Sequence, residues 1–293
     1  MSKLSPERWA FDITRLLNAV LGDNRFPVKV PDVAMEISKA KFPDDPVAFV
    51  HGADLPGFDG ALYPAPPGKK GWGIIYNNRI ASEGRINFTL AHEFGHYLLH
   101  RMHNPKGFNC GQQDVVRWDS EYGQIEHQAN VFAATLLMPL DDFRRQIDPR
   151  ADAEIDQLSA CADRYRVSLV ASALRWLQFT ERRAVLVVSR DGYILWARSS
   201  ERALRTRAYF RTSGPPIAVP PESLAATRSD TRNEIQHPGG VWFPTETKEV
   251  VVRSEQYDFI ISLLTLADDD RPWLPDAESE EDTYDRYKRS RQT

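Results

Sequence analysis

The sequence predicts an α+β protein, in which helical segments and short strands occupy different stretches of the chain. Apolar residues recur at helical spacing near the start of the chain and again in its middle. Short β-prone segments bounded by glycine and proline lie between these helical stretches, and a hairpin signal follows the second of them. Together these three patterns predict separate helices and sheets.

The bulk composition is that of an ordinary soluble globular protein. The length of 293 residues predicts about two domains. The net charge of −4 gives no reason to expect binding to nucleic acid or to an acidic membrane surface. Two cysteines, Cys110 and Cys161, are too few for a disulfide framework or a cysteine-based zinc site. Because the sequence has neither a signal peptide nor a membrane-length apolar run, we expect a reduced, cytoplasmic protein.

The first half of the chain predicts four helices and three strands. The helices are expected at about 6–21, 32–42, 85–102 and 121–138, and the strands at 47–50, 58–64 and 71–78. The stretch NPKGFNCGQQ, at 104–113, is expected to be a loop. Pro139 marks the end of the fourth helix.

The second half begins with a helical block at 153–179. Its middle resembles a helix-turn-helix, with Ser168 capping the second helix. Residues 183–198 are typical of a β-hairpin with Asp191-Gly192 at the turn. The stretches 248–254 and 259–266 are expected to be strands, although a buried helix is an alternative for the second.

Residues 92–96 read His-Glu-Phe-Gly-His on the third predicted helix. Because an α-helix turns about 100° per residue, His92 and His96 point the same way and can bind one Zn²⁺ through ring nitrogens. Glu93 lies beside them but off the ligand line, which is the position that a general base requires. The spacing predicts that Glu93 takes a proton from a zinc-activated water, which attacks a peptide carbonyl. The alternative is a helix that merely happens to carry histidines.

A catalytic zinc needs a third protein ligand, and several candidates exist. His100 continues the histidine stripe, but it lies about 6 Å further along the helix axis, so its coordination would be strained. The metzincin spacing fails because Leu99 and Met102 stand where glycine and histidine are needed. Cys110 could supply a thiolate from its loop.

The remaining candidate ligand is Glu126, on the fourth predicted helix. Asn130 follows one turn later on the same face. Asn130 could accept a hydrogen bond from the outer ring N–H of His92 and so fix the tautomer of that ring.

The stretch RINFTLAHEFGHYLLH, followed by IEHQANVFAATLLMP, resembles the ImmA/IrrE family of zinc metallopeptidases over about residues 30 to 140. The resemblance implies a compact zincin-like domain of the gluzincin type. It also implies that His92, His96 and Glu126 bind Zn²⁺ and that Glu93 is the catalytic base. Thermolysin-like relatives have an aspartate where this chain has Asn130. The amide of Asn130 still offers an oxygen that accepts a hydrogen bond, but it lacks the negative charge of a carboxylate.

The resemblance further implies a substrate class. Members of this family typically cleave or inactivate helix-turn-helix repressors encoded nearby, and so derepress stress, phage or mobile-element genes. We therefore expect a zinc metallo-endopeptidase that acts on an XRE-type repressor encoded nearby, with no membrane partner and no direct DNA binding. The alternative is a non-hydrolytic zinc-binding regulator, or an antitoxin-like partner, that acts by protein–protein binding.

The expected organisation has four parts. Residues 1–145 would form the zincin-like domain, and 146–180 a helical segment packed on it. Residues 181–267 would form a C-terminal α/β domain, for which gating of the peptidase by a sensed ligand is one hypothesis. Residues 268–293 are rich in charge and poor in aliphatic residues, which predicts a flexible tail.

The strand at 71–78 is a candidate for substrate binding. Zincin domains resemble one another in using an edge strand beside the active helix to align the substrate. Exposed backbone at Ile74, Ile75, Tyr76 and Asn77 could pair with an extended peptide by β-augmentation. The alternative is an ordinary sheet strand in which Trp72, Ile74 and Tyr76 are packed.

Four further residues near the motif have both functional and structural interpretations. Tyr97 or Tyr122 could donate a hydrogen bond to the developing oxyanion, although packing would explain either residue. His100 is expected to be a surface or hydrogen-bonded histidine. Cys110 could act as a redox switch on the metal.

Overall fold

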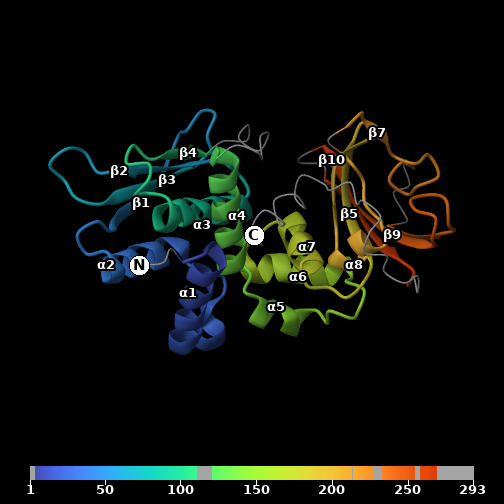
Figure 1. The fold of residues 1–293 in the computed structure, drawn as a ribbon, viewed down its shortest axis with the longest axis horizontal. Coiled ribbons are helices and arrows are strands. Elements are labelled where there is room, and N and C mark those ends of the chain that lie inside the picture. The colour runs from blue at the N-terminus through green and yellow to red at the C-terminus, as the bar shows by residue number, and fades with distance from the viewer. Residues whose placement is uncertain (1–3, 111–120, 213, 228–232, 255–257, 269–293) are drawn as a thin grey trace. The chain divides into compact units, whose positions relative to one another are not determined.

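The computed structural model describes residues 4–110, 121–212, 214–227, 233–254 and 258–268. These residues form helices and two β-sheets, which confirms the predicted mixture of α and β structure (Figure 1). The chain divides into two compact units, Met1–Phe143 with Ser159–Ala171, and Arg144–Leu158 with Ser172–Thr293. The four-part division expected from the sequence stays a prediction.

The first unit opens with α1 (Pro6–Leu21), η1 (Gly22–Arg25) and α2 (Val30–Lys41). The Ser5 side chain accepts a hydrogen bond from the backbone N–H of Arg8, which caps the start of α1. Gly22 ends this helix with a φ of +57°, a conformation that glycine adopts without steric cost. The bounds of α1 agree with the sequence prediction.

A four-stranded sheet follows, in the order β1-β3-β2-β4. Its strands are β1 (Val47–Ala53), β2 (Gly60–Pro64), β3 (Trp72–Asn77) and β4 (Phe108–Cys110). β1 and β3 are parallel, and the other pairs are antiparallel. The prediction of a loop at 104–113 is wrong at β4. Three residues are too few to show an alternating pattern, and the strand forms by pairing with β2.

β3 is an inner strand of this sheet. Residues Trp72 to Asn77 pair with β1 on one side, and Trp72 to Tyr76 pair with β2 on the other. The backbone N–H of Asn77 donates to the carbonyl oxygen of Asp59, just before β2. The backbone of Ile74, Ile75, Tyr76 and Asn77 is therefore already used in the sheet, and the prediction that it is exposed for a substrate peptide is wrong. The alternative of a packed strand holds for Trp72 and Ile74, which are buried.

Helix α3 (Glu83–Leu99) lies along one face of this sheet and packs against β2 and β3 (Figure 1). Helix α4 (Glu121–Leu137) packs closely on α3. A Cβ atom added at Gly95 would lie 3.1 Å from a ring carbon of Phe132 and 3.2 Å from the Cα atom of Ala129. The glycine therefore permits the close approach of the two helices that carry the predicted site.

Three helices follow, namely α5 (Leu140–Gln146), α6 (Ile155–Tyr165) and α7 (Leu169–Leu177). The turn before α7 contains Arg166 with a φ of +51°. Ser168 accepts a hydrogen bond from the backbone N–H of Ala171, which confirms the predicted cap. The helix-turn-helix character of this block stays a prediction.

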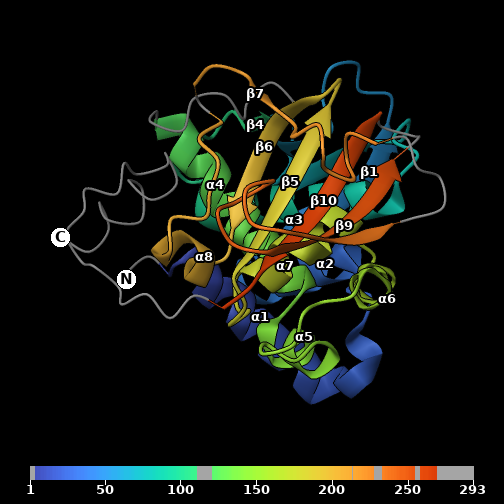
Figure 2. The same ribbon diagram turned by 90° about the vertical axis from the view of Figure 1, so that its right-hand side faces the viewer.

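The second unit contains a six-stranded antiparallel sheet in the order β7-β6-β5-β10-β9-β8. Figure 2 shows β6, β5, β10 and β9 side by side in this order. The elements are β5 (Ala184–Arg190), β6 (Tyr193–Ser199), α8 (Glu201–Arg205), β7 (Ile217–Ala218), β8 (Glu234–His237), β9 (Thr247–Ser254) and β10 (Phe259–Leu266).

The predicted hairpin is present between β5 and β6. Asp191 and Gly192 both have positive φ angles, of 51° and 78°, as a two-residue turn of this kind requires. The stretch 259–266 is the strand β10 rather than a buried helix.

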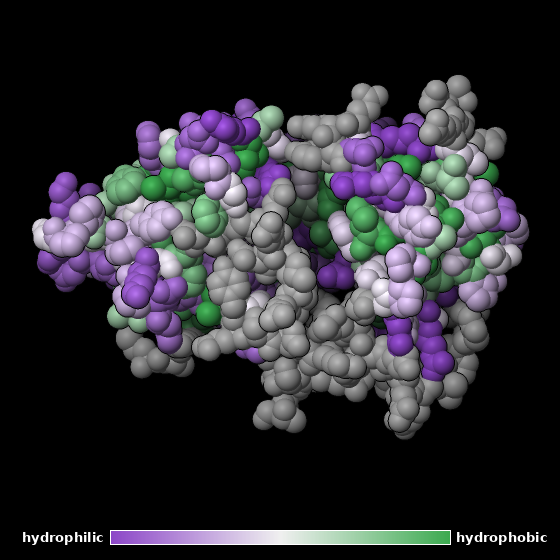
Figure 3. Space-filling model, turned by 90° about the horizontal axis from the view of Figure 1, so that it is seen from above, coloured by the Kyte–Doolittle hydropathy of each residue, from purple (hydrophilic) through white to green (hydrophobic). Residues whose placement is uncertain are grey.

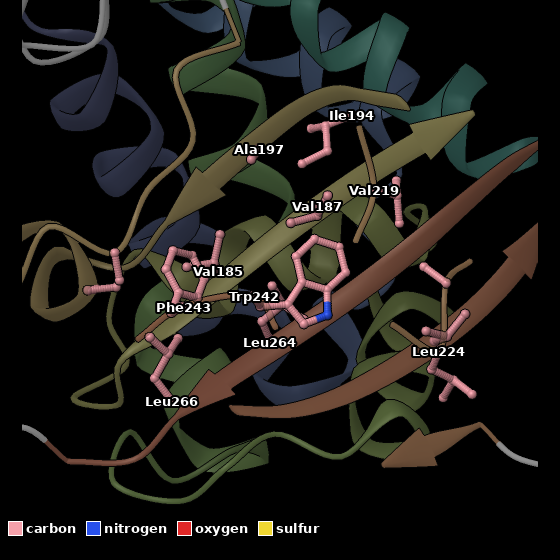
Figure 4. Packing of buried hydrophobic residues seen from close by; sticks show 14 residues of the cluster. Val185, Val187, Ile194, Ala197, Val219, Leu224, Trp242, Phe243, Leu264 and Leu266 are labelled. Carbon is pink, nitrogen blue, oxygen red and sulfur yellow. The ribbon is translucent and has the colours of Figure 1, made fainter. Parts of the chain in front are cut away.

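One face of the second sheet is covered by an apolar cluster. In Figure 4 the rings of Trp242 and Phe243 lie over β5 and β10, against Val185, Val187 and Leu264. Burial of such side chains stabilises the fold by roughly 25 cal/mol per Å² of apolar surface.

Some large apolar side chains stay exposed, including Phe11 and Val20 on α1 and Phe49 on β1. On the face seen in Figure 3, apolar side chains lie among polar ones. Scattered apolar exposure of this kind is normal. Among the described residues, no helix combines the length and hydropathy needed to cross a membrane.

Candidate metal centre

Two helices bring three potential metal ligands together. α3 supplies His92 and His96, one turn apart, and α4 supplies Glu126. The Nε2 atom of His92 lies 3.1 Å from one carboxylate oxygen of Glu126, and the Nε2 atom of His96 lies 3.2 Å from the other. The two Nε2 atoms are 2.9 Å apart. The structure thus assembles the three residues that the sequence singled out.

The chemistry of these donors fits a transition-metal ion. The three ligand atoms lie within 4.8 Å of one another, and both imidazole rings are buried. Two imidazole nitrogens and one carboxylate, with a coordination position left open, are the donor set typical of a catalytic zinc. The side chain of Cys110, another candidate ligand, lies outside the described residues.

The outer nitrogen of each histidine has a partner of its own. The Nδ1 atom of His92 lies 2.9 Å from Oδ1 of Asn130, as the sequence predicts for this pair. The Nδ1 atom of His96 lies 3.1 Å from Nδ1 of His100. The ring of Phe108, on β4, stacks on the His96 ring with centroids 4.4 Å apart. Both rings are therefore held in fixed orientations.

His100 is buried rather than on the surface, and it is hydrogen-bonded. Its Nε2 atom lies 3.0 Å from Oε1 of Gln128, and its Nδ1 atom faces His96. With both ring nitrogens engaged in this way, His100 is not a member of the three-ligand group.

Glu93 is completely buried next to strand β2. A Cβ atom on Gly60 would lie 3.0 Å from Oε1 of Glu93 and 2.4 Å from a methyl carbon of Thr89. Its negative charge also acts on the neighbouring His92 ring. The carboxylate thus lies beside the ligand group without belonging to it.

Burial and hydrogen bonding shift the pKa values of the three candidate ligands in different directions. Burial lowers the pKa of His96 from 6.5 to about 3, so this ring stays neutral. Burial also lowers the pKa of His92, but the hydrogen bond to Glu126 and the charge of Glu93 outweigh that effect and raise it. Burial raises the pKa of Glu126, but its contacts with the two imidazole rings outweigh that effect and hold the pKa well below its usual range. Glu126 is therefore ionised and ready to bind a cation.

Comparison with protein-family models identifies the part of the chain that carries this group. Residues 48–177 match the Peptidase_M78 model, the IrrE N-terminal-like domain. This match supports an ImmA/IrrE family assignment for this part of the chain. The ImmA/IrrE domain contains β1 to β4 and both helices of the ligand group, so a metallopeptidase-type function is supported at the family level. A comparison with curated protein sequences gave no match.

Within the ImmA/IrrE domain, Tyr97 packs rather than faces the ligand group. Its ring is fully buried, and its hydroxyl donates a 2.6 Å hydrogen bond to the backbone carbonyl of Asp45. Burial raises the pKa of this hydroxyl to about 12. The packing alternative therefore holds for Tyr97. The side chain of Tyr122 lies outside the described residues.

Sequence reasoning missed two contributors to the site of the ImmA/IrrE domain. The first is Gln128, which contacts His100. The i, i+4 spacing of His96 and His100 predicts a contact between these two rings, but nothing in the sequence connects His100 with Gln128. Gly60 is also missed, because its importance arises only where β2 meets α3.

Proposed function

We propose that this protein is a zinc-dependent endopeptidase with a gluzincin-type site, and that it cleaves a protein substrate. The observation that carries the proposal is the convergence of His92, His96 and Glu126 on one point, with Glu93 buried beside them. A helix-turn-helix repressor encoded nearby is the proposed substrate, on the strength of the family resemblance.

In this proposal His92, His96 and Glu126 hold the ion. A zinc ion bound there acts as a Lewis acid on water and on the peptide carbonyl. Asn130 keeps the His92 ring in the orientation and tautomer that present Nε2 to the ion. The low pKa of Glu126 keeps the third ligand ionised.

Glu93 is the proposed general base. A carboxylate oxygen of Glu93 takes a proton from the attacking water and later gives it to the amine nitrogen of the departing peptide. Burial of Glu93 beside Gly60 leaves its side chain little room to move, so the carboxylate is held in one position.

The test compares wild type with Glu93→Gln in metal analysis and in cleavage of the repressor encoded nearby. We expect Glu93→Gln to bind one equivalent of zinc and to lose cleavage by at least about 100-fold, within the range for a general base. Glu83→Gln is the matched control, because Glu83 is exposed in the first turn of the same helix. Cleavage by Glu93→Gln at the wild-type rate would contradict the mechanism.

The same variant separates hydrolysis from a purely binding role. If Glu93→Gln still relieves repression in the cell as wild type does, a non-hydrolytic regulator would explain the site better than a peptidase. If wild type cuts an unstructured test protein but not the repressor, the peptidase stands and only the substrate is wrong.

A further inference from the structure

The ligand His96 is linked to an amide oxygen through a second histidine. The Nδ1 atom of His96 lies 3.1 Å from Nδ1 of His100, and the Nε2 atom of His100 lies 3.0 Å from Oε1 of Gln128. His96 is fully buried, and His100 is 6% exposed. The link therefore runs through the interior between α3 and α4.

The chemistry of these atoms fixes where the protons lie. An amide oxygen can only accept a hydrogen bond, so the Nε2 atom of His100 carries the proton that it donates to Gln128. A neutral imidazole has one N–H, so the Nδ1 atom of His100 is an acceptor. The hydrogen bond between the two rings is then donated by Nδ1 of His96, and the lone pair of His96 is left on Nε2.

We propose that His100 and Gln128 are positioning residues for the metal, which hold His96 in the tautomer whose Nε2 lone pair faces Glu126 and His92. This inference rests on the proposed metal site. The opposite tautomer of His96 would place a proton on Nε2, where it blocks coordination. Gln128 thus does for His96, through one intervening ring, what Asn130 does directly for His92.

The proposal also explains why His100 is a histidine. Imidazole can accept at one nitrogen and donate at the other. His100 therefore accepts from His96 at Nδ1 because its Nε2–H is donated to Gln128. A phenylalanine would fill similar space but would leave the buried Nδ1–H of His96 without an acceptor.

The test measures zinc affinity by competition with a chelator. We expect Gln128→Leu and His100→Phe each to raise the zinc Kd by about 10- to 100-fold, the usual effect of losing such an outer partner. Gln128→Glu, which presents acceptors only, should keep the wild-type Kd or lower it. Gln124→Leu is the matched control, because Gln124 is an exposed glutamine on the same helix, and it should bind zinc as wild type does.

A second measurement reads the tautomers of His96 and His100 directly. In ¹⁵N-labelled wild type loaded with zinc, long-range ¹H–¹⁵N correlation should show His96 protonated at Nδ1 and His100 protonated at Nε2. In zinc-free Gln128→Leu, His96 should become a mixture of tautomers.

The results separate this inference from the proposed function. Failure of wild type to bind zinc at all would overturn both. Wild-type zinc affinity in Gln128→Leu and His100→Phe would overturn the positioning role alone. Two results would overturn the proposed direction of the hydrogen bonds from His96 through His100 to Gln128. One is a zinc Kd for Gln128→Glu raised as far as that for Gln128→Leu, and the other is a His100 ring protonated at Nδ1 in wild type.

Discussion

The Oδ1 atom of Asn130 lies 2.9 Å from the Nδ1 atom of His92, on the side of the ring away from Glu126. This contact keeps a proton on Nδ1 of His92, so that Nε2 is the nitrogen that can coordinate a metal ion. We expect Asn130→Ala to raise the zinc Kd by about 10- to 100-fold, whereas Asn130→Asp should bind zinc at least as tightly as wild type. Competition with a chelator measures both values, with Gln124→Ala on the same helix as control. Equal affinities for Asn130→Ala and wild type would remove Asn130 from the site.

Gly60 allows strand β2 to approach helix α3 closely. An added Cβ atom would lie 2.4 Å from the Thr89 side chain and 3.0 Å from Oε1 of Glu93, so something must shift. We expect Gly60→Ala to lower kcat/KM by about 10- to 100-fold, because it displaces the proposed base. Zinc affinity should change little, since the three ligands come from other positions.

The control for this substitution is Gly214→Ala, because a Cβ atom at Gly214 would meet open space. Steady-state cleavage and chelator competition, measured on the same preparations, give the two readouts. Loss of zinc binding in Gly60→Ala, in parallel with activity, would mean that the glycine supports the ligands rather than Glu93.

The zinc-free protein should lose stability in acid because of His96. Burial lowers the pKa of this ring from 6.5 to about 3. Between these values the unfolded chain binds a proton at His96 and the folded protein does not, so the free energy of unfolding falls as the pH falls. The contribution of His92 to the free energy of unfolding changes with pH in the opposite direction. Because its pKa is raised in the folded protein, this contribution is fully present below pH 6.5 and is lost as the pH rises.

Denaturant unfolding in the presence of a chelator, at several pH values between about 7 and 4, measures this effect. We expect His96→Asn to show a shallower loss of stability than wild type over this range, and His103→Asn, at an exposed position, to keep the wild-type slope. Parallel curves for wild type and His96→Asn would show that His96 is not held neutral by burial.

Glu249 links several segments of the second unit. Its buried carboxylate accepts hydrogen bonds from His237, Trp242, Ser262 and the backbone N–H groups of Leu224 and Ala225. We expect Glu249→Leu to lower the free energy of unfolding by at least about 3 kcal/mol, because it leaves these buried donors without an acceptor. Glu234→Gln, at an exposed residue of β8, should change it by less than about 0.5 kcal/mol. Denaturant titration checks both, and a loss below about 1 kcal/mol for Glu249→Leu would contradict the prediction.

The prediction of secondary structure from the sequence succeeded where the sequence pattern is local. The apolar stripe of α1, the Ser168 cap of α7 and the Asp191-Gly192 turn of the β5–β6 hairpin depend on neighbouring residues only. The prediction failed at β4 and at the exposed edge expected for β3. A three-residue strand has no readable periodicity, and the position of a strand within a sheet depends on partners distant in sequence.

The sequence by itself identified His92 and His96 as candidate ligands and offered Glu126 among several candidates for the third. One turn of helix separates His92 from His96 and places Glu93 beside them, and this follows from the geometry of a single helix. The pairing of Glu126 with Asn130 is local to α4 in the same way.

Only the tertiary structure decided how the two helices meet. The approach of α3 and α4 at Gly95 brings Glu126 within about hydrogen-bond distance of both imidazole rings, and it brings Gln128 to His100. These contacts join residues that lie far apart in the chain, so they depend on side-chain packing between helices, which no periodicity in the sequence records.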